Sequence, residues 1–310
     1  MFRFCLDLGG TGTRGALFSA EGKLVGRAEG EAGALSLGAE AAERAIREVW
    51  ARLGVHLPDH PPAANVAIWA GIAGSGLPGR AKDLRNRLSD FADVTIIGDG
   101  YASLLGATSG KPGALIAVGT GVGAVRLDLQ KKVTALSGWG FPAGDLGSGA
   151  WIGLEFFRAA LKSLDGSPVF PGISPQTLNR FVGMCGPTDN DLMQWHTGAR
   201  PKQFAGLAPM VLDAAADGDA FCDDLLNRAA REIADVAIAL RVKDLPVHIG
   251  GGLGKSLMHR LAATEPDIDW QPASGDAVQG LLLLAQGKAP PEIFQKRPGF
   301  LALNTREANQ

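Results

Sequence analysis

A carboxylate followed by a turn rich in glycine and threonine opens the chain. Asp7 stands near the end of the apolar run Phe2–Leu8, and the turn Gly9-Gly10-Thr11-Gly12-Thr13 follows it. Glycines let backbone N–H groups close on phosphate oxygens, and threonine hydroxyls add donors. A carboxylate here suits Mg²⁺, which takes few protein carboxylates and fills its shell with water and phosphate oxygens. A plain glycine hairpin, with Asp7 accepting backbone N–H groups, is the alternative.

Two common nucleotide loops do not fit this turn. The chain contains no GxxxxGK[ST] stretch. A strand, Gly15–Ser19, is predicted after the turn, whereas a dinucleotide fingerprint opens a helix.

A second carboxylate, Asp99, follows the apolar strand predicted over Val94–Ile97 and precedes a helix predicted over Tyr101–Ala107. A carboxylate so placed could accept the proton of an attacking hydroxyl in phosphoryl transfer, where the rest of catalysis is positioning and charge stabilisation. The alternative is that Asp99 caps the helix, which is common for aspartate.

Two later glycine turns resemble parts of a nucleotide site. Gly119-Thr120-Gly121 follows the apolar strand Ala114–Val118 and repeats the logic of the first turn, so it could grip phosphates as well. Gly250-Gly251-Gly252 follows the strand Pro246–Ile249 and could lie flat against an adenine or a ribose.

The stretch from Gly138 to Gly149 combines glycines with Trp139 and Asp145. One aromatic ring, one carboxylate and a pliant backbone suit sugar recognition by ring packing and hydroxyl hydrogen bonds. Core packing of Trp139 is the alternative.

These motifs need strands and helices to bring them together. A strand, a glycine-threonine turn and a strand occur at the start of the chain and again about a hundred residues later, which indicates two related α/β domains. The expected boundary lies near Thr108–Pro112. The predicted domains are an N-terminal domain over 1–108, a C-terminal domain over 109–288 and a tail over 289–310.

Composition favours a globular, cytoplasmic protein. The chain has 310 residues, of which 46% are hydrophobic and 20% charged, so two domains can bury a core. A net charge of -2 without a basic run argues against nucleic acid and against an anionic membrane surface. No signal peptide and no apolar stretch of about 18 residues is visible. The three cysteines, Cys5, Cys185 and Cys222, are far apart, which favours buried thiols over a metal site or disulfides.

The order of these motifs resembles the actin-like ATPase superfold of sugar kinases, Hsp70 and actin. Within it, the chain resembles the BadF/BadG/BcrA/BcrD ATPase family, which includes N-acetylglucosamine and glucosamine kinases. That family usually shows GGWG and then GDEGSxxWI, and this chain has Ser137-Gly138-Trp139-Gly140 and then Gly144-Asp145-Leu146-Gly147-Ser148 running to Trp151-Ile152-Gly153. The stretch Asp276–Ala285 resembles the closing helix of the family, often DxxxGALLLA.

The resemblance implies an α/β, two-domain actin-like ATPase (ribonuclease H-like) fold with ATP, Mg²⁺ and sugar in an inter-domain cleft. Asp7 would associate with Mg²⁺, and Asp99 would be the catalytic base. Leu146 stands where the family usually has Glu, so sugar preference could differ from the family norm. The nucleotide would contact Gly9, Gly10, Thr11, Gly12, Thr13, Gly119, Thr120, Gly121, Gly250, Gly251 and Gly252. The sugar would contact Thr120, Gly138, Trp139 and Asp145.

The function implied is transfer of the ATP γ-phosphoryl group to the 6-hydroxyl of glucosamine or N-acetylglucosamine, with the choice of sugar left open. Its partner would be that small amino sugar, and the oligomeric state stays open, with a homodimer as the state common in the family. One alternative is a non-catalytic sensor of the same fold. Another is an activator ATPase of the 2-hydroxyacyl-CoA dehydratase type, whose iron–sulfur cluster needs closely placed cysteines that the spacing here does not offer.

Overall fold

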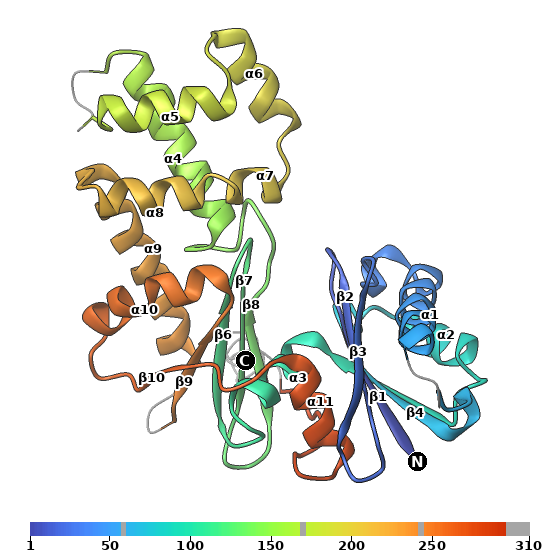
Figure 1. The fold of residues 1–310 in the computed structure, drawn as a ribbon. Helices are drawn as coiled ribbons and strands as arrows, with labels where there is room; N and C mark the ends of the chain where they lie inside the picture. Colours follow the sequence, from blue (N-terminus) through green and yellow to red (C-terminus); the bar gives the residue numbers. More distant parts are fainter. Residues whose placement is uncertain (57–59, 168–171, 241–244, 296–310) are drawn as a thin grey trace, which may run out of the picture. The chain divides into compact units, whose positions relative to one another are not determined.

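The computed structural model describes residues 1–56, 60–167, 172–240 and 245–295. The described chain contains two five-stranded sheets with helices packed around them (Figure 1). This arrangement confirms the predicted α/β class. The end of the predicted tail, 296–310, lies outside the described residues.

The first sheet places the strand that carries Asp7 at its centre. Its strand order is β3-β2-β1-β4-β5. The hairpin partners β2 and β3 run antiparallel, whereas β4 and β5 run parallel to β1. Parallel strands bring their carboxyl ends to one edge, which is where binding residues collect in open α/β sheets. The strands are β1 (Phe2–Leu8), β2 (Thr13–Phe18), β3 (Leu24–Gly30), β4 (Val66–Ile72) and β5 (Asp93–Gly98).

Helices cover both faces of the first sheet (Figure 1). Helices α1 (Ala39–His56) and α2 (Arg80–Arg87) lie on one face, and α3 (Asp99–Ala107) and α11 (Ala277–Ala285) on the other. Ile46 and Val49 of α1 are fully buried in the core beside β1 and β2, and burial of such a side chain contributes roughly 1.5–3 kcal/mol. Two short 3-10 helices, Leu35–Leu37 and Ala63–Asn65, complete this region.

The second sheet repeats the order of the first. Its order is β10-β9-β6-β7-β8, so β6, β7 and β8 correspond to β1, β2 and β3, while β9 and β10 correspond to β4 and β5. The expectation from the repeated strand–turn–strand pattern is therefore confirmed at the level of topology. The strands are β6 (Gly113–Val118), β7 (Val122–Leu127), β8 (Val133–Ser137), β9 (Val247–Gly250) and β10 (Trp270–Pro272).

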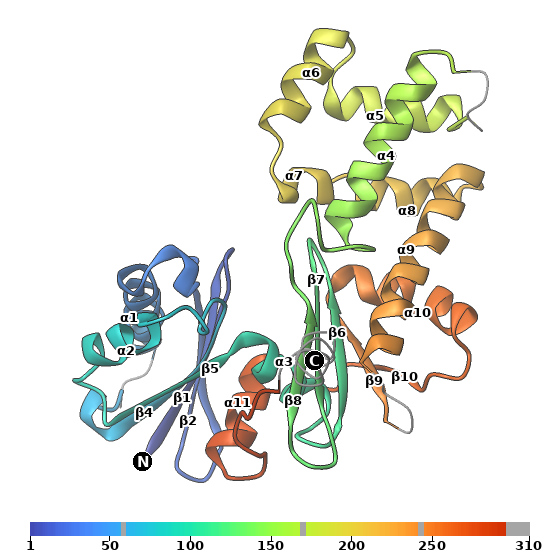
Figure 2. The same ribbon diagram turned by 180° about the vertical axis from the view of Figure 1, so that it is seen from behind.

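Seven helices of the described chain accompany the second sheet. Helix α10 packs against β9 and β10, and α9 packs against α10 (Figure 2). Phe157 and Trp195 stack with their ring centroids 5.1 Å apart, which ties α4 to α6. The helices are α4 (Gly149–Leu164), α5 (Pro175–Cys185), α6 (Asp189–Gly198), α7 (Pro201–Ala205), α8 (Ala208–Ala216), α9 (Ala220–Ala239) and α10 (Gly252–Thr264).

The chain folds into two compact units. The N-terminal unit comprises Met1–Leu115, Val125–Thr134 and the described residues from Ala273 onward, and the central unit comprises Ile116–Ala124 and Ala135–Pro272. The predicted domains over 1–108, 109–288 and 289–310 are each one continuous stretch of the chain. In the structure, α11 packs on α3, so segments that are distant along the chain lie in the same unit.

The three cysteines are buried and free. They lie on three different elements, β1, α5 and α9. Burial raises the pKa of Cys5 and of Cys185 to about 12, so both stay as thiols near neutral pH. Among the described residues no group of three or more His, Cys, Asp or Glu side chains could hold a metal ion.

None of the helices in the described part of the chain combines the length and the apolar character that crossing a membrane requires.

Candidate functional site

Asp7 lies one residue before the end of β1, opposite Arg14 of β2 and Gly71 of β4. Burial is the main cause that raises the pKa of Asp7 to about 6. The negative charges of Asp99 and Asp276 act in the same direction, and the positive charge of Arg14 opposes them. The folded protein therefore disfavours the ionised form of the Asp7 carboxylate, and a pKa raised in this way is typical of functional sites.

Asp99 is the first residue of α3, and Gly98 is the N-cap of that helix. Burial raises the pKa of Asp99, while the backbone N–H groups of Gly100 and of Asp99 itself lower it. The carboxylate thus lies in the first turn and not at the capping position proposed as the alternative. Because its charge acts on Asp7, the structure brings the two predicted carboxylates into one acidic site of the N-terminal unit.

Asp276 is a third carboxylate whose charge acts on Asp7, and its sequence did not predict this position. It is the N-cap of α11 and forms a capping box with Gln279, in which Asp276 Oδ1 accepts the Gln279 N–H at 2.9 Å. The available signal was an Asp three residues before Gln at the start of an apolar helix, which predicts a cap but not a position beside β1.

Hydrogen bonds at the base of the first glycine turn fix its conformation. The Thr13 hydroxyl donates to the Glu31 carbonyl oxygen at 2.7 Å and is almost fully buried, so it braces the hairpin. The Gly9 N–H donates to the Gly12 carbonyl oxygen at 3.0 Å, while Gly10 and Thr11 at the tip are exposed. The tip is therefore the part of this turn that a phosphate can reach.

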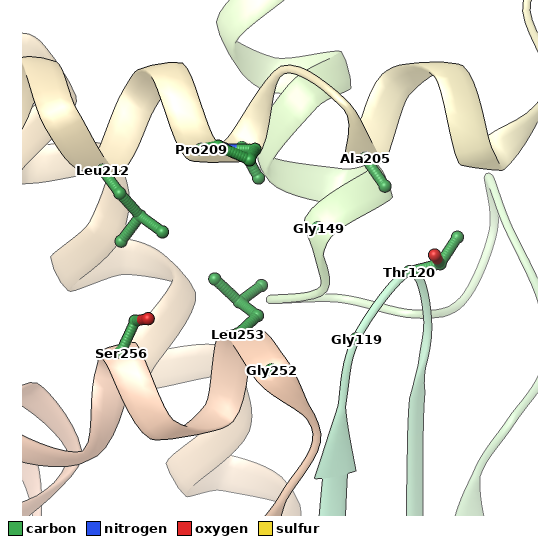
Figure 3. Close-up of a pocket in the computed structure, with 10 residues that line it drawn as sticks. Gly119, Thr120, Gly149, Ala205, Pro209, Leu212, Gly252, Leu253 and Ser256 are labelled. Carbon is green, nitrogen blue, oxygen red and sulfur yellow. The ribbon is translucent and has the colours of Figure 1, made fainter.

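A cavity of about 360 Å³ lies in the central unit and takes in the second glycine turn (Figure 3). Gly119 and Thr120 form one side, and Leu212 and Leu253 contribute apolar surface. Such a mixture of backbone donors and apolar walls is typical of small-molecule sites. The cavity is lined by Gly119, Thr120, Gly149, Ala205, Ala208, Pro209, Leu212, Gly252, Leu253 and Ser256.

The run of three glycines serves the turn from β9 into α10. Gly251 has φ of +81°, and a Cβ there would collide with the Val118 carbonyl oxygen, so only glycine fits. Gly252 opens α10 and lines the cavity, while Gly250 ends β9. The first N–H groups of a helix have no partner within the helix and favour anions, so α10 offers donors to this cavity.

The loop from Gly138 to Ser148 is tied to the second glycine turn. Asp145, with φ of +58°, accepts the Val122 N–H on Oδ1 at 3.2 Å. A Cβ on Gly121 would lie 2.9 Å from Asp145 Oδ2, so the carboxylate packs closely on the turn. Trp139 is 65% exposed, which excludes the alternative of core packing. Leu146 is also exposed.

Within each unit, the structure collects a subset of the predicted residues. Asp7 and Asp99 meet in the N-terminal unit, and Gly119, Thr120 and Gly252 meet at the cavity of the central unit. Several cavity residues from α7 and α8, such as Ala205 and Leu212, were missed. Their sequence shows only the apolar spacing of a packed helix, which carries no signal for a ligand.

The repeated sheet topology is that of the actin-like fold, and the acidic site and the glycine-lined cavity are features that an ATPase of this fold requires. The chain belongs to the BadF/BadG/BcrA/BcrD ATPase family, whose model matches residues 6–277. ATP is accordingly the nucleotide of this family. The resemblance drawn from the GWG and WIG stretches is confirmed.

Relatives and solved structures agree with this assignment. Glucosamine kinase GspK of Vibrio cholerae is 27% identical over 294 residues, covering 94% of this chain and 97% of its own. A solved structure from Chromobacterium violaceum, provisionally named an N-acetylglucosamine kinase, is 35% identical with a TM-score of 0.81 and covers 91% of this chain and 98% of its own. A ROK family glucokinase from Streptomyces griseus is 16% identical with a TM-score of 0.55, over 92% of this chain and 98% of its own, and so shares the fold.

Proposed function

We propose that this chain is an ATP-dependent amino-sugar kinase that transfers the γ-phosphoryl group to the 6-hydroxyl of glucosamine or N-acetylglucosamine. The observation that carries the proposal is the half-buried Asp99 at the start of α3, directly after β5, whose charge acts on Asp7. The names of the Vibrio and Chromobacterium relatives support an amino sugar as the acceptor.

Asp99 is the proposed general base. The strand β5 and the first turn of α3 fix its backbone, and a partly desolvated carboxylate with a raised pKa is a better proton acceptor than an exposed one. In the proposed reaction it accepts the proton of the attacking hydroxyl as the oxygen bonds to phosphorus and ADP leaves.

The cavity of the central unit is the proposed nucleotide site. Apolar walls from α8 and α10 suit the adenine ring, and the Gly119–Gly121 turn and the start of α10 offer N–H groups to phosphates. The tip of the Gly9–Thr13 turn offers further donors. The assignment of individual phosphates to these turns is part of the proposal.

Mg²⁺ fits the chemistry of the acidic site. The charges of Asp99 and Asp276 both raise the pKa of Asp7, and a divalent cation held near Asp7 through water would relieve this repulsion. Asp7 would hold the ion mostly through water and phosphate oxygens, where it supplies positive charge to the transferring phosphoryl group.

The sugar is assigned to the loop that carries Trp139. An exposed indole can pack on a sugar ring, and the positive φ angles of Gly138 and Gly140 give this loop its shape. Asp145 braces the loop against Val122, so its proposed contribution includes holding the sugar loop on the second glycine turn. Thr120 is a candidate for contact with both ligands.

A coupled ADP-release assay with Mg·ATP tests the proposal. The panel is glucosamine, N-acetylglucosamine, N-acetylmannosamine, glucose and no sugar, with the 6-deoxy form of the best substrate as the matched control. We expect one amino sugar to stimulate ADP release well above background and its 6-deoxy form to remain inert. ATP binding without stimulation of ADP release by any sugar would overturn the proposed kinase activity and favour a nucleotide-binding sensor.

A further inference from the structure

The last described segment, Pro290–Gln295, which we call the C-terminal strap, is fastened to the N-terminal unit at both of its ends. The hydroxyl of Tyr101 on α3 donates to the Pro290 carbonyl oxygen at 2.8 Å, and Tyr101 is only 1% exposed. At the other end, the Val133 N–H donates to the Ile293 carbonyl oxygen and the Gln295 N–H donates to the Val133 carbonyl oxygen, both at 2.8 Å. The strap is therefore a fixed part of this unit.

Between these two attachment points, the Glu292 carboxylate lies at the junction of β5 and α3, directly before Asp99. The Gly98 N–H donates to both carboxylate oxygens of Glu292, each at 3.2 Å. Gly98 ends β5, an edge strand, and is the N-cap of α3. A carboxylate is a strong acceptor for this N–H, and negative charge is favourable at the start of a helix.

Other features of its surroundings disfavour the ionised form of Glu292. Burial raises the pKa of Glu292, the Gly98 N–H lowers it, and the charge of Asp99 raises it. A neutral acceptor would satisfy the Gly98 N–H without repelling Asp99. A partly buried carboxylate next to a second carboxylate is a typical mark of a functional arrangement.

We propose that Glu292 is a positioning residue for Asp99, and that the C-terminal strap belongs to the catalytic unit. Glu292 fixes the Gly98 N–H, and Pro290 fixes Tyr101 two residues beyond Asp99, so the strap holds the first turn of α3 on both sides of the base. The matched stretch of the family model ends at residue 277, before this segment. The inference rests on the proposed role of Asp99 as the base.

The test compares E292A and E292Q in the full chain, with E40Q on the exposed start of α1 as control. We expect E292A to lower kcat by about ten- to a hundredfold while the KM for ATP stays within about twofold. E292Q should recover to within about threefold of the parent kcat, because its amide oxygen still accepts the Gly98 N–H. The variant Y101F, which removes only the bond to Pro290, should fall between them.

Two further readouts separate positioning from a general loss of folding. Thermal unfolding gives the folded fraction, and kcat is expressed per folded molecule. In the background of D99N, E292A should cause no further loss of turnover, because a residue that acts through Asp99 has nothing left to position.

The failures can be told apart. Full kcat in E292A, or equal losses in E292A and E292Q, would overturn the role of Glu292 while D99N remains inactive. Parent turnover in D99N would instead show that Asp99 is not the general base, and the inference rests on that role. If E292A does not fold, E292Q and Y101F still decide: E292Q at or below the kcat of Y101F contradicts positioning through the Gly98 hydrogen bond.

Discussion

Gly71 and Asp99 approach so closely that a Cβ placed on Gly71 would lie 3.6 Å from the Asp99 Cα and 2.7 Å from the Ala102 Cβ. Gly71 is the β4 residue that pairs with Asp7 of β1. The lack of a side chain at this one position lets α3 rest on the sheet beside Asp7, which brings the two carboxylates of the acidic site together.

The first prediction concerns this contact. G71A should push α3 away from β4, cost about 1–3 kcal/mol of the free energy of unfolding and lower kcat. G76A is the control, because a Cβ on Gly76 meets nothing within 4 Å. Denaturant unfolding and the coupled assay measure the two effects. Unchanged stability in G71A would show that the approach of α3 is not set by this glycine.

The second prediction concerns the base. D99N should lower kcat by about 10²- to 10⁴-fold, because an amide cannot accept the hydroxyl proton. The Kd for ATP, measured by calorimetry, should stay within about twofold. D93N, on the exposed start of β5, serves as the control. Near-parent turnover in D99N would remove Asp99 from the mechanism.

The third prediction concerns the stability of the free protein. The pKa of Asp7 rises from 3.8 to about 6 on folding, so its contribution to stability is present below the unfolded pKa and is lost as pH rises through 6. D7N avoids ionisation and should raise the free energy of unfolding by about 1–3 kcal/mol at pH 7 without metal. The gain should shrink as pH falls towards 4.

Denaturant unfolding from pH 4 to pH 8 measures this gain, and activity should fall in D7N even as stability rises. A gain that is the same at every pH would show that the charge of Asp7 is not its cause.

The fourth prediction concerns the cavity of the central unit. L212A removes part of its apolar wall and should raise the Kd for ATP by about five- to thirtyfold, because the adenine loses contact area. M193A removes an exposed apolar side chain elsewhere in the same unit and should leave the Kd unchanged. Equal Kd values for L212A and the parent would place adenine elsewhere.

The sequence by itself determined most elements and the order of the motifs. The apolar runs Phe2–Leu8 and Ala114–Val118 are strands in the structure, and the helix expected over Tyr101–Ala107 is α3, which begins two residues earlier at Asp99. Local periodicity and turn residues suffice for such elements because their backbone hydrogen bonds and caps are made within a few residues.

The tertiary structure alone decided which distant residues meet. Asp276 and Glu292 reach the acidic site because α11 packs on α3 and the strap pairs with Val133, and neither contact has a periodic signal in the sequence. Gly71 is another such case, since the need for glycine arises from the approach of Ala102 across the sheet. Contacts of this kind depend on how whole elements pack, and an apolar helix shows that it will be buried without showing against which partner.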